Sequence, residues 1–139
     1  MIVREQPVSP SSRSLHVLIA EDNPDGRATL STLLRLLGHQ VETAEDGLRA
    51  IEKAAASPPE VVFIDIGLPR LNGYQVAQRL RQAFGRRIFL IAYTAYNQPE
   101  DRQQAYDAGV DAYLVKPVDV SELDYWLTVA ARRRLHTDP

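Results

Sequence analysis

Five short segments typical of strands alternate with helical patterns along this chain, and this alternation is what most restricts its possible folds. Four of the segments are apolar runs, over residues 15–20, 61–64, 88–92 and 112–115, and another short strand is expected over residues 41–44. Between them, apolar residues recur at the three- and four-residue spacing of a helix. Strands that alternate with helices favour a parallel sheet with right-handed crossovers and helices on both faces. We therefore predict an α/β fold, a doubly wound five-stranded parallel sheet with five helices in the flavodoxin-like strand order 2-1-3-4-5.

Local signals predict where the helices begin and which sides they bury. Asn23 suits the N-cap of the first helix and Pro24 its first turn, and Gly38 suits its end. The last helix is expected to bury Leu123, Leu127 and Ala130. The inward face of the second helix is expected to carry Leu48, Ile51, Ala54 and Ala55.

Length and composition indicate one soluble domain. The chain has 139 residues and no cysteine, which excludes disulfides and thiolate metal sites. Residues 1–14 hold two prolines, four serines and no apolar period, so we predict a mobile tail, a domain over residues 15–134, and a C-terminal tail over 135–139. The first residues lack the apolar core of a signal peptide, and the apolar runs are too short to span a bilayer. The expectation is a cytoplasmic domain without membrane contact.

Polar residues follow four of the five predicted strands. Glu21-Asp22 follows the first strand and Asp65 the third, while Thr94 and Lys116-Pro117 end the fourth and fifth. Parallel α/β sheets form their sites outside the carboxyl ends of the strands. We therefore expect these side chains to gather at one edge of the sheet.

The three carboxylates suit a divalent cation. In the predicted strand order the first and third strands are neighbours, so Glu21, Asp22 and Asp65 should converge, and such close like charges repel unless a cation neutralises them. Oxygen ligands favour Mg²⁺, or Mn²⁺, over zinc, and the backbone carbonyl of Gly67 is a further candidate ligand. Lys116 is placed to pair with Asp65 and later with a phosphate.

Each of these residues also has an ordinary structural interpretation. Asp65 is placed where an acid caps a turn or a helix, and Glu21-Asp22 where acids complement a helix dipole. Thr94 is a common strand residue, and lysine is most often a surface residue. The functional interpretation depends on all five positions occurring together, in order, at the strand ends.

Together with several shorter runs, these residues resemble the receiver domain of two-component response regulators over about residues 15–134. The shorter runs are Gly38-His39-Gln40-Val41, Asp46-Gly47, Leu68-Pro69, Gly73-Tyr74 and Ala108-Gly109-Val110-Asp111-Ala112-Tyr113. The resemblance implies a phospho-accepting regulatory domain rather than an enzyme. A histidine kinase or a histidine phosphotransfer protein would be the donor of the phosphoryl group.

The resemblance also implies a role for each matching residue. Asp65 would accept the phosphoryl group, and Thr94 and Lys116 would bind its oxygens. Tyr113 would be a switch aromatic that turns inward as Thr94 moves toward the phosphate. The metal ligands implied are Glu21, Asp22, Asp65 and the Gly67 carbonyl.

The expected output surface is the last helix–strand–helix face, residues 99–108, 112–115 and 120–133. This face would bind a downstream protein or a second copy of the chain. Direct DNA binding is not expected, because Arg132-Arg133-Arg134 suits a solvated helix end and no output domain follows Pro139. A piece of a larger hybrid kinase or regulator is equally compatible with the sequence.

Some residues depart from the family pattern, and other functions compete. Tyr93 precedes Thr94 where a small aliphatic residue is more usual, and Gly67 and Tyr96 lie where the family tunes acyl-phosphate hydrolysis, which we expect to be slow. A haloacid-dehalogenase-type phosphatase would need an acid at Gly67, and a flavodoxin-like cofactor carrier would not place Glu21-Asp22 against a phosphate. A receiver that cannot be phosphorylated and acts as a scaffold is the remaining alternative.

Overall fold

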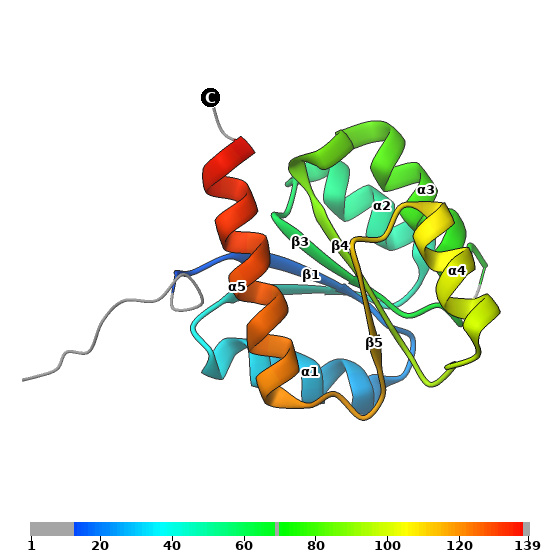
Figure 1. Ribbon diagram of the computed structural model, residues 1–139, viewed down its shortest axis with the longest axis horizontal. Helices are drawn as coiled ribbons and strands as arrows, with labels where there is room; N and C mark the ends of the chain where they lie inside the picture. Colours follow the sequence, from blue (N-terminus) through cyan, green and yellow to red (C-terminus); the bar gives the residue numbers. More distant parts are fainter. Residues whose placement is uncertain (1–12, 69, 138–139) are drawn as a thin grey trace, which may run out of the picture.

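The structure, a computed structural model, describes residues 13–68 and 70–137 and contains a parallel sheet between two layers of helices (Figure 1). The sheet has the order β2-β1-β3-β4-β5, as predicted. Helices α1 and α5 cover one face, and α2, α3 and α4 cover the other. The strands are β1 (His16–Ala20), β2 (Gln40–Ala44), β3 (Val61–Ile64), β4 (Phe89–Thr94) and β5 (Ala112–Val115). The helices are α1 (Pro24–Leu36), α2 (Gly47–Ala56), α3 (Gly73–Phe84), α4 (Pro99–Ala108) and α5 (Val120–Thr137), with a 3₁₀ turn, η2 (Gly85–Arg87).

Two apolar clusters fill the space between the layers. All four residues of β3 are buried, as expected for a central parallel strand covered on both faces. Phe63 belongs to the cluster under α1 and α5, and the next residue, Ile64, belongs to the cluster under α2, α3 and α4. The period-two alternation of a strand thus assigns successive side chains to opposite cores.

Most predicted helix ends are confirmed. The side chain of Asn23 accepts hydrogen bonds from the backbone N–H groups of Asp25 and Gly26, and Pro24 opens α1. The predicted inward face of α2 is wrong in part, because Leu48 and Ala55 are exposed while Ala50 and Ala54 are buried. The first residue of α2, Gly47, lies so close to Leu71 and Val76 that a side chain at this position would clash with them.

The termini differ from the predicted boundaries. The predicted tail over residues 1–14 falls mostly outside the described residues, but Arg13 contacts the folded domain. Its guanidinium donates to the Ala131 carbonyl and to the Glu60 carboxylate, each at 3.3 Å. At the other end, α5 continues to Thr137, past the predicted end at residue 134. Among the described helices, none combines the length and the apolar character needed to span a membrane.

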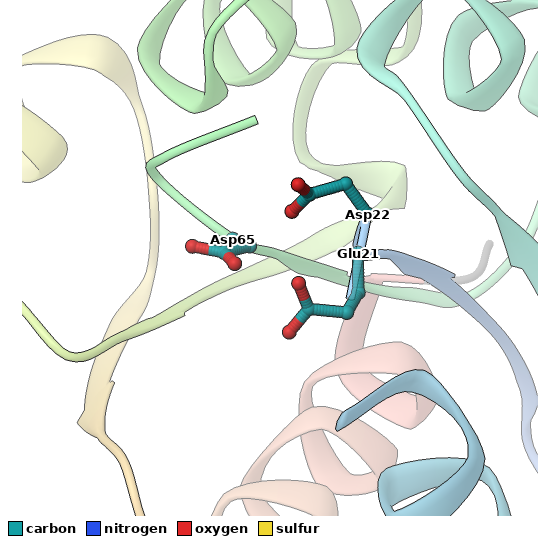
Figure 2. Close-up of side chains that lie close together, drawn as sticks. All are labelled: Glu21, Asp22 and Asp65. Carbon is teal, nitrogen blue, oxygen red and sulfur yellow. The ribbon is translucent and has the colours of Figure 1, made fainter. Parts of the chain in front are cut away.

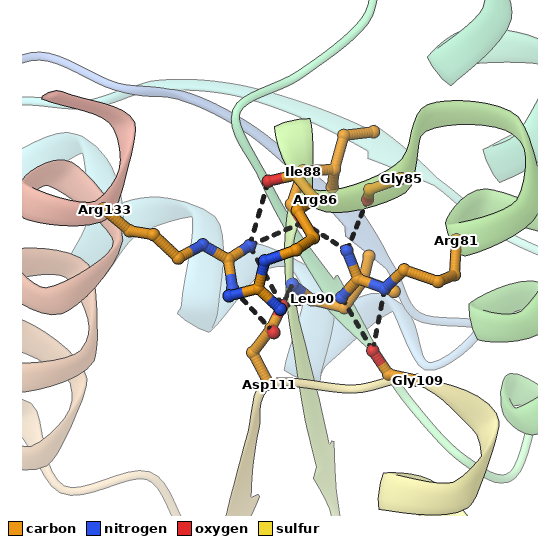
Figure 3. A network of polar contacts seen from close by, with 8 residues as sticks. All are labelled: Arg81, Gly85, Arg86, Ile88, Leu90, Gly109, Asp111 and Arg133. Carbon is orange, nitrogen blue, oxygen red and sulfur yellow. Dashed lines mark hydrogen bonds and ion pairs between the residues drawn. The ribbon is translucent and has the colours of Figure 1, made fainter. Parts of the chain in front are cut away.

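An ionic network holds α3 and α5 to the residues that precede β4 and β5, at the amino-terminal ends of the strands (Figure 3). The acids Glu21, Asp22 and Asp65 follow the carboxyl-terminal ends of their strands. Asp111 accepts from Arg81 of α3 and from Arg133 of α5, each at 2.7 Å, and also from the backbone N–H of Leu90 at 2.8 Å. Arg133 therefore does not form the solvated helix end that was expected. Asp111, which precedes β5, supplies the partner that the local sequence of α5 does not reveal.

A buried histidine joins the start of β2 to the start of β1. His39 is 4% exposed, and its Nδ1 accepts a hydrogen bond from the backbone N–H of Leu15 at 3.1 Å. Within the part of the chain that the structure describes, Nε2 has no hydrogen-bond partner. Burial lowers the pKa of His39 below its ordinary value of 6.5, against the opposing effect of Asp124 and Glu60. An Nδ1 that accepts a hydrogen bond belongs to a neutral imidazole.

His39 should therefore make the domain less stable in acid. A histidine whose pKa is lowered by folding contributes stability above pH 6.5, and that contribution is lost as the pH falls below 6.5. The loss amounts to about 1.4 kcal/mol for each unit by which folding lowers the pKa. Urea unfolding at a series of pH values should show a shallower slope below pH 6.5 for His39→Asn, which keeps an acceptor but does not titrate. The partly exposed His16 is the control, and an equal slope in His39→Asn and His16→Asn would contradict this prediction.

Candidate functional site

The strand register brings the predicted site residues to one edge of the sheet. Ala20 of β1 pairs with Ile64 of β3, and Ile64 pairs with Ala92 of β4. Thr94 pairs with Val115 of β5. The residues that end or follow these strands therefore lie side by side, as predicted: Glu21, Asp22, Asp65, Thr94 and Lys116.

Three carboxylates form the centre of this site (Figure 2). Glu21 and Asp22 leave β1 in succession, and Asp65 leaves β3 beside them. One oxygen from each of the three lies within 4.8 Å of the other two. Glu21 and Asp65 are buried, whereas Asp22 is exposed, so the cluster has an open side toward solvent.

Asp65 is held from two sides. Its Oδ1 accepts from the backbone N–H of Gly67 at 3.0 Å, and its Oδ2 accepts from Lys116 Nζ at 3.1 Å. Burial raises the pKa of Asp65 to about 6, and the neighbouring Glu21 carboxylate acts in the same direction. A partly desolvated carboxylate beside a lysine is therefore present where the sequence predicts the phospho-acceptor.

Glu21 receives more hydrogen bonds than the sequence suggests. Its Oε1 accepts from Lys116 Nζ at 2.6 Å and from the Tyr93 hydroxyl at 2.8 Å, while Oε2 accepts from the backbone N–H of Asn23 at 3.2 Å. Burial raises the pKa of Glu21, but the hydrogen bonds from these donors outweigh it and lower the pKa to about 2. Lys116 is thus shared between Glu21 and Asp65, and the shorter contact is to Glu21.

The donor set fits a hard divalent cation. Among the described residues, the ion pairs of these three carboxylates are with Lys116, which leaves an excess of negative charge in a partly buried place. Carboxylate oxygens with an open side for water are what Mg²⁺ prefers over softer metals. The ligand role of the Gly67 carbonyl stays a prediction.

Thr94 and Tyr113 are connected through the backbone of Tyr96. Thr94 is buried, and its hydroxyl oxygen accepts from the Tyr96 N–H at 3.2 Å. Tyr113 is also buried, points inward, and donates its hydroxyl to the Tyr96 carbonyl at 2.6 Å. The guanidinium of Arg102 in α4 lies 4.7 Å from the centre of the Tyr113 ring. Contacts therefore run from the site hydroxyl to α4.

The residue at position 67 lies under a tyrosine. A side-chain carbon built on Gly67 would be 3.4 Å from the Tyr96 hydroxyl, and Tyr96 is half-exposed. Tyr96 thus partly covers the loop that follows Asp65. Whether Tyr96 slows hydrolysis of an acyl phosphate stays a prediction.

Comparison with known proteins identifies relatives across most of the chain. The profile of the response regulator receiver domain family matches residues 17–127. A gliding motility regulatory protein of Myxococcus xanthus is 38% identical over 109 residues, which are 78% of this chain and 14% of that protein. The transcriptional regulatory protein PrrA of Mycobacterium tuberculosis is 36% identical over 121 residues, 87% of this chain and 52% of that protein. This chain thus spans about half of the length of PrrA and a much smaller part of the gliding motility regulatory protein.

A solved structure extends the comparison to the site. The receiver domain of a sensor histidine kinase from Pseudomonas aeruginosa PAO1 is 32% identical, with a TM-score of 0.79, and the match covers 86% of this chain and 99% of that one. That structure holds a magnesium ion coordinated in its active-site cleft.

Proposed function

Because the chain belongs to the response regulator receiver domain family, we propose that it is a phospho-acceptor switch of two-component signalling in which Asp65 takes a phosphoryl group from a phosphohistidine. The donor would be a sensor kinase or a histidine phosphotransfer protein. The observation that carries the proposal is the Asp65 carboxylate at the end of buried β3, between two other carboxylates and 3.1 Å from Lys116 Nζ. The cytoplasmic location expected from the sequence stays a prediction.

The reaction needs positioning and charge neutralisation more than covalent assistance. A carboxylate oxygen of Asp65 attacks phosphorus, the N–P bond of the phosphohistidine breaks, and the imidazole keeps the electron pair and takes up a proton. Lys116, already within hydrogen-bond distance of Asp65, binds a phosphoryl oxygen, and the Thr94 hydroxyl binds another after exchanging its contact with the Tyr96 N–H.

Asp22, Asp65 and the Gly67 carbonyl are the residues that would hold Mg²⁺, and Glu21 would add its negative charge beside them. The ion supplies positive charge that offsets the repulsion between the acids and the incoming phosphate.

An aspartyl phosphatase of the haloacid-dehalogenase type would need an acid at position 67, and this chain has a glycine there. This residue favours a phospho-acceptor over a phosphatase. The proposal is tested by incubating the protein with acetyl phosphate and Mg²⁺. We expect the protein to take up one phosphoryl group, and we expect this uptake to stop when a chelator removes Mg²⁺.

We further propose that the output surface is the face formed by α4, β5 and α5. Any movement of Thr94 toward the phosphate disturbs the Tyr96 backbone, which Tyr113 contacts, and the Tyr113 ring lies against Arg102 of α4. Exposed aromatic side chains on α4 and α5, Tyr106 and Tyr125, suit a protein partner or a second copy of the chain.

Hydrogen exchange with and without beryllofluoride, a mimic of the acyl phosphate, tests this surface. In the presence of Mg²⁺, we expect protection to change in the β4–α4 loop, α4 and β5, because the chain of contacts from Thr94 ends there. Asp65→Asn should show no such change. Changes confined to the loops around Asp65 would contradict the proposed output surface.

A further inference from the structure

Tyr93 places a buried hydroxyl against a site carboxylate. The residue lies inside β4, is 2% exposed, and donates to Glu21 Oε1 at 2.8 Å. Burial and the Glu21 charge raise the pKa of Tyr93 above its ordinary value, so the hydroxyl keeps its proton and acts as the donor. The family pattern gives no role to this residue.

The ring of Tyr93 is itself held in place. It makes an edge-to-face contact with Phe63 at a centroid distance of 6.1 Å, and Lys116 Nζ lies 4.7 Å from the ring centre. One side chain thus contacts both the glutamate and the lysine of the site. Because packing fixes the ring, the position of the hydroxyl is determined by the core and not by the site loops.

Glu21 has little freedom within this enclosure. Its two carboxylate oxygens receive Tyr93, Lys116 and the Asn23 N–H. Gly26 of α1 closes the remaining side, because a side-chain carbon built there would be 3.1 Å from Glu21 Oε1. The Asp22 carboxylate, by contrast, is exposed, and no hydrogen bond to it is found within residues 13–68 and 70–137.

We propose that Tyr93 is a positioning residue that fixes the Glu21 carboxylate on Lys116, which leaves Asp22 and Asp65 as the carboxylates that bind the divalent cation directly. This inference rests on the proposed Mg²⁺ site. Glu21 then acts on the cation from outside its ligand sphere, through an orientation set by Tyr93 and Gly26. Residues that orient metal ligands and neighbouring acceptors affect metal affinity even though they do not touch the metal.

Calorimetric titration of the apo protein with MgCl₂ alone tests the role of Tyr93. Tyr93→Phe keeps the ring contacts with Phe63 and Lys116 and removes only the hydroxyl. We expect it to weaken Mg²⁺ binding by severalfold and at most about tenfold, because Tyr93 acts through Glu21 and not on a direct ligand, whose orienting groups contribute about tenfold or more. Tyr125→Phe, which removes a hydroxyl from an exposed tyrosine of α5, is the matched control and should bind Mg²⁺ as the wild type does.

Two further variants separate positioning from general loss of structure. If Tyr93 acts through Glu21, then Tyr93→Phe should have no effect on Mg²⁺ affinity in a Glu21→Ala background. Gly26→Ala places a methyl group against Glu21 Oε1 and should also weaken Mg²⁺ binding. Alanine raises the helix propensity of this position, so circular dichroism should show that the fold is retained. Weaker Mg²⁺ binding with the fold retained would show that displacement of Glu21 acts on the site and not through unfolding.

Failure of this inference is distinct from failure of the proposed function. Wild-type affinity in Tyr93→Phe, with binding lost in Asp22→Ala, would overturn the role of Tyr93 and leave the metal site in place. An equal loss in Tyr93→Phe with and without Glu21 would also overturn it. A wild-type protein that does not bind Mg²⁺, or an Asp22→Ala variant that binds it normally, would overturn the metal assignment itself.

Discussion

Asp65→Asn is expected to abolish phosphorylation and to leave the fold intact. The amide has nearly the shape of the carboxylate but lacks its nucleophilic oxygen. The variant also removes one of the clustered negative charges, so no loss of stability is expected from repulsion. Intact mass after incubation with Mg²⁺ and acetyl phosphate should show one added phosphoryl group on the wild type and none on Asp65→Asn.

An acid outside the site provides the control for this prediction. Asp107 lies exposed on α4, and Asp107→Asn should accept a phosphoryl group as the wild type does. Circular dichroism of the three proteins should coincide. An adduct of equal yield on Asp65→Asn would place the acceptor elsewhere.

Asp111→Ala is expected to produce the largest loss of stability among single changes in the polar network. Removal of this carboxylate leaves Arg81 and Arg133 without their shared acceptor and the Leu90 N–H without a partner. These side chains are largely buried, with 14% of the Asp111 side chain and 17% of the Arg133 side chain exposed. Breaking a buried ion pair from one side lowers the free energy of unfolding by about 3 kcal/mol or more, a large share of the total.

Urea unfolding should be compared with that of a solvent-exposed ion pair. The Glu45 and Arg49 side chains are 61% and 59% exposed, so Glu45→Ala should change the free energy of unfolding by less than about 1 kcal/mol. Equal effects of Asp111→Ala and Glu45→Ala would show that the network does not hold α3 and α5 to the sheet.

The fold was predictable because every element carries a local signal. The apolar runs indicate four of the strands, and Asn23, Pro24 and Gly38 indicate helix ends through capping and backbone geometry. The error in α2 has a different origin. Apolarity alone selected Leu48 for the buried face, but the close approach of Leu71 to Gly47, a tertiary property, places Gly47, Ala50 and Ala54 on that face.

The site was predictable as a set of residues but not as a set of contacts. The alternation indicates a parallel sheet, and the observed strand order and register bring Glu21, Asp65 and Lys116 together. The sequence does not reveal that Lys116 lies closer to Glu21 than to Asp65, because that depends on side-chain directions. A signal for Tyr93 did exist: a tyrosine in an otherwise apolar buried strand needs a partner for its hydroxyl.

The most direct test of the phospho-acceptor role is to locate the phosphoryl group chemically. Borohydride reduces an aspartyl phosphate to homoserine, and peptide mass mapping then identifies the reduced position. After incubation of the wild type with Mg²⁺ and acetyl phosphate, we predict homoserine at position 65 and at no other acid. Homoserine at another aspartate, or a phosphoryl group that resists reduction because it is on a hydroxyl, would contradict the assignment of Asp65.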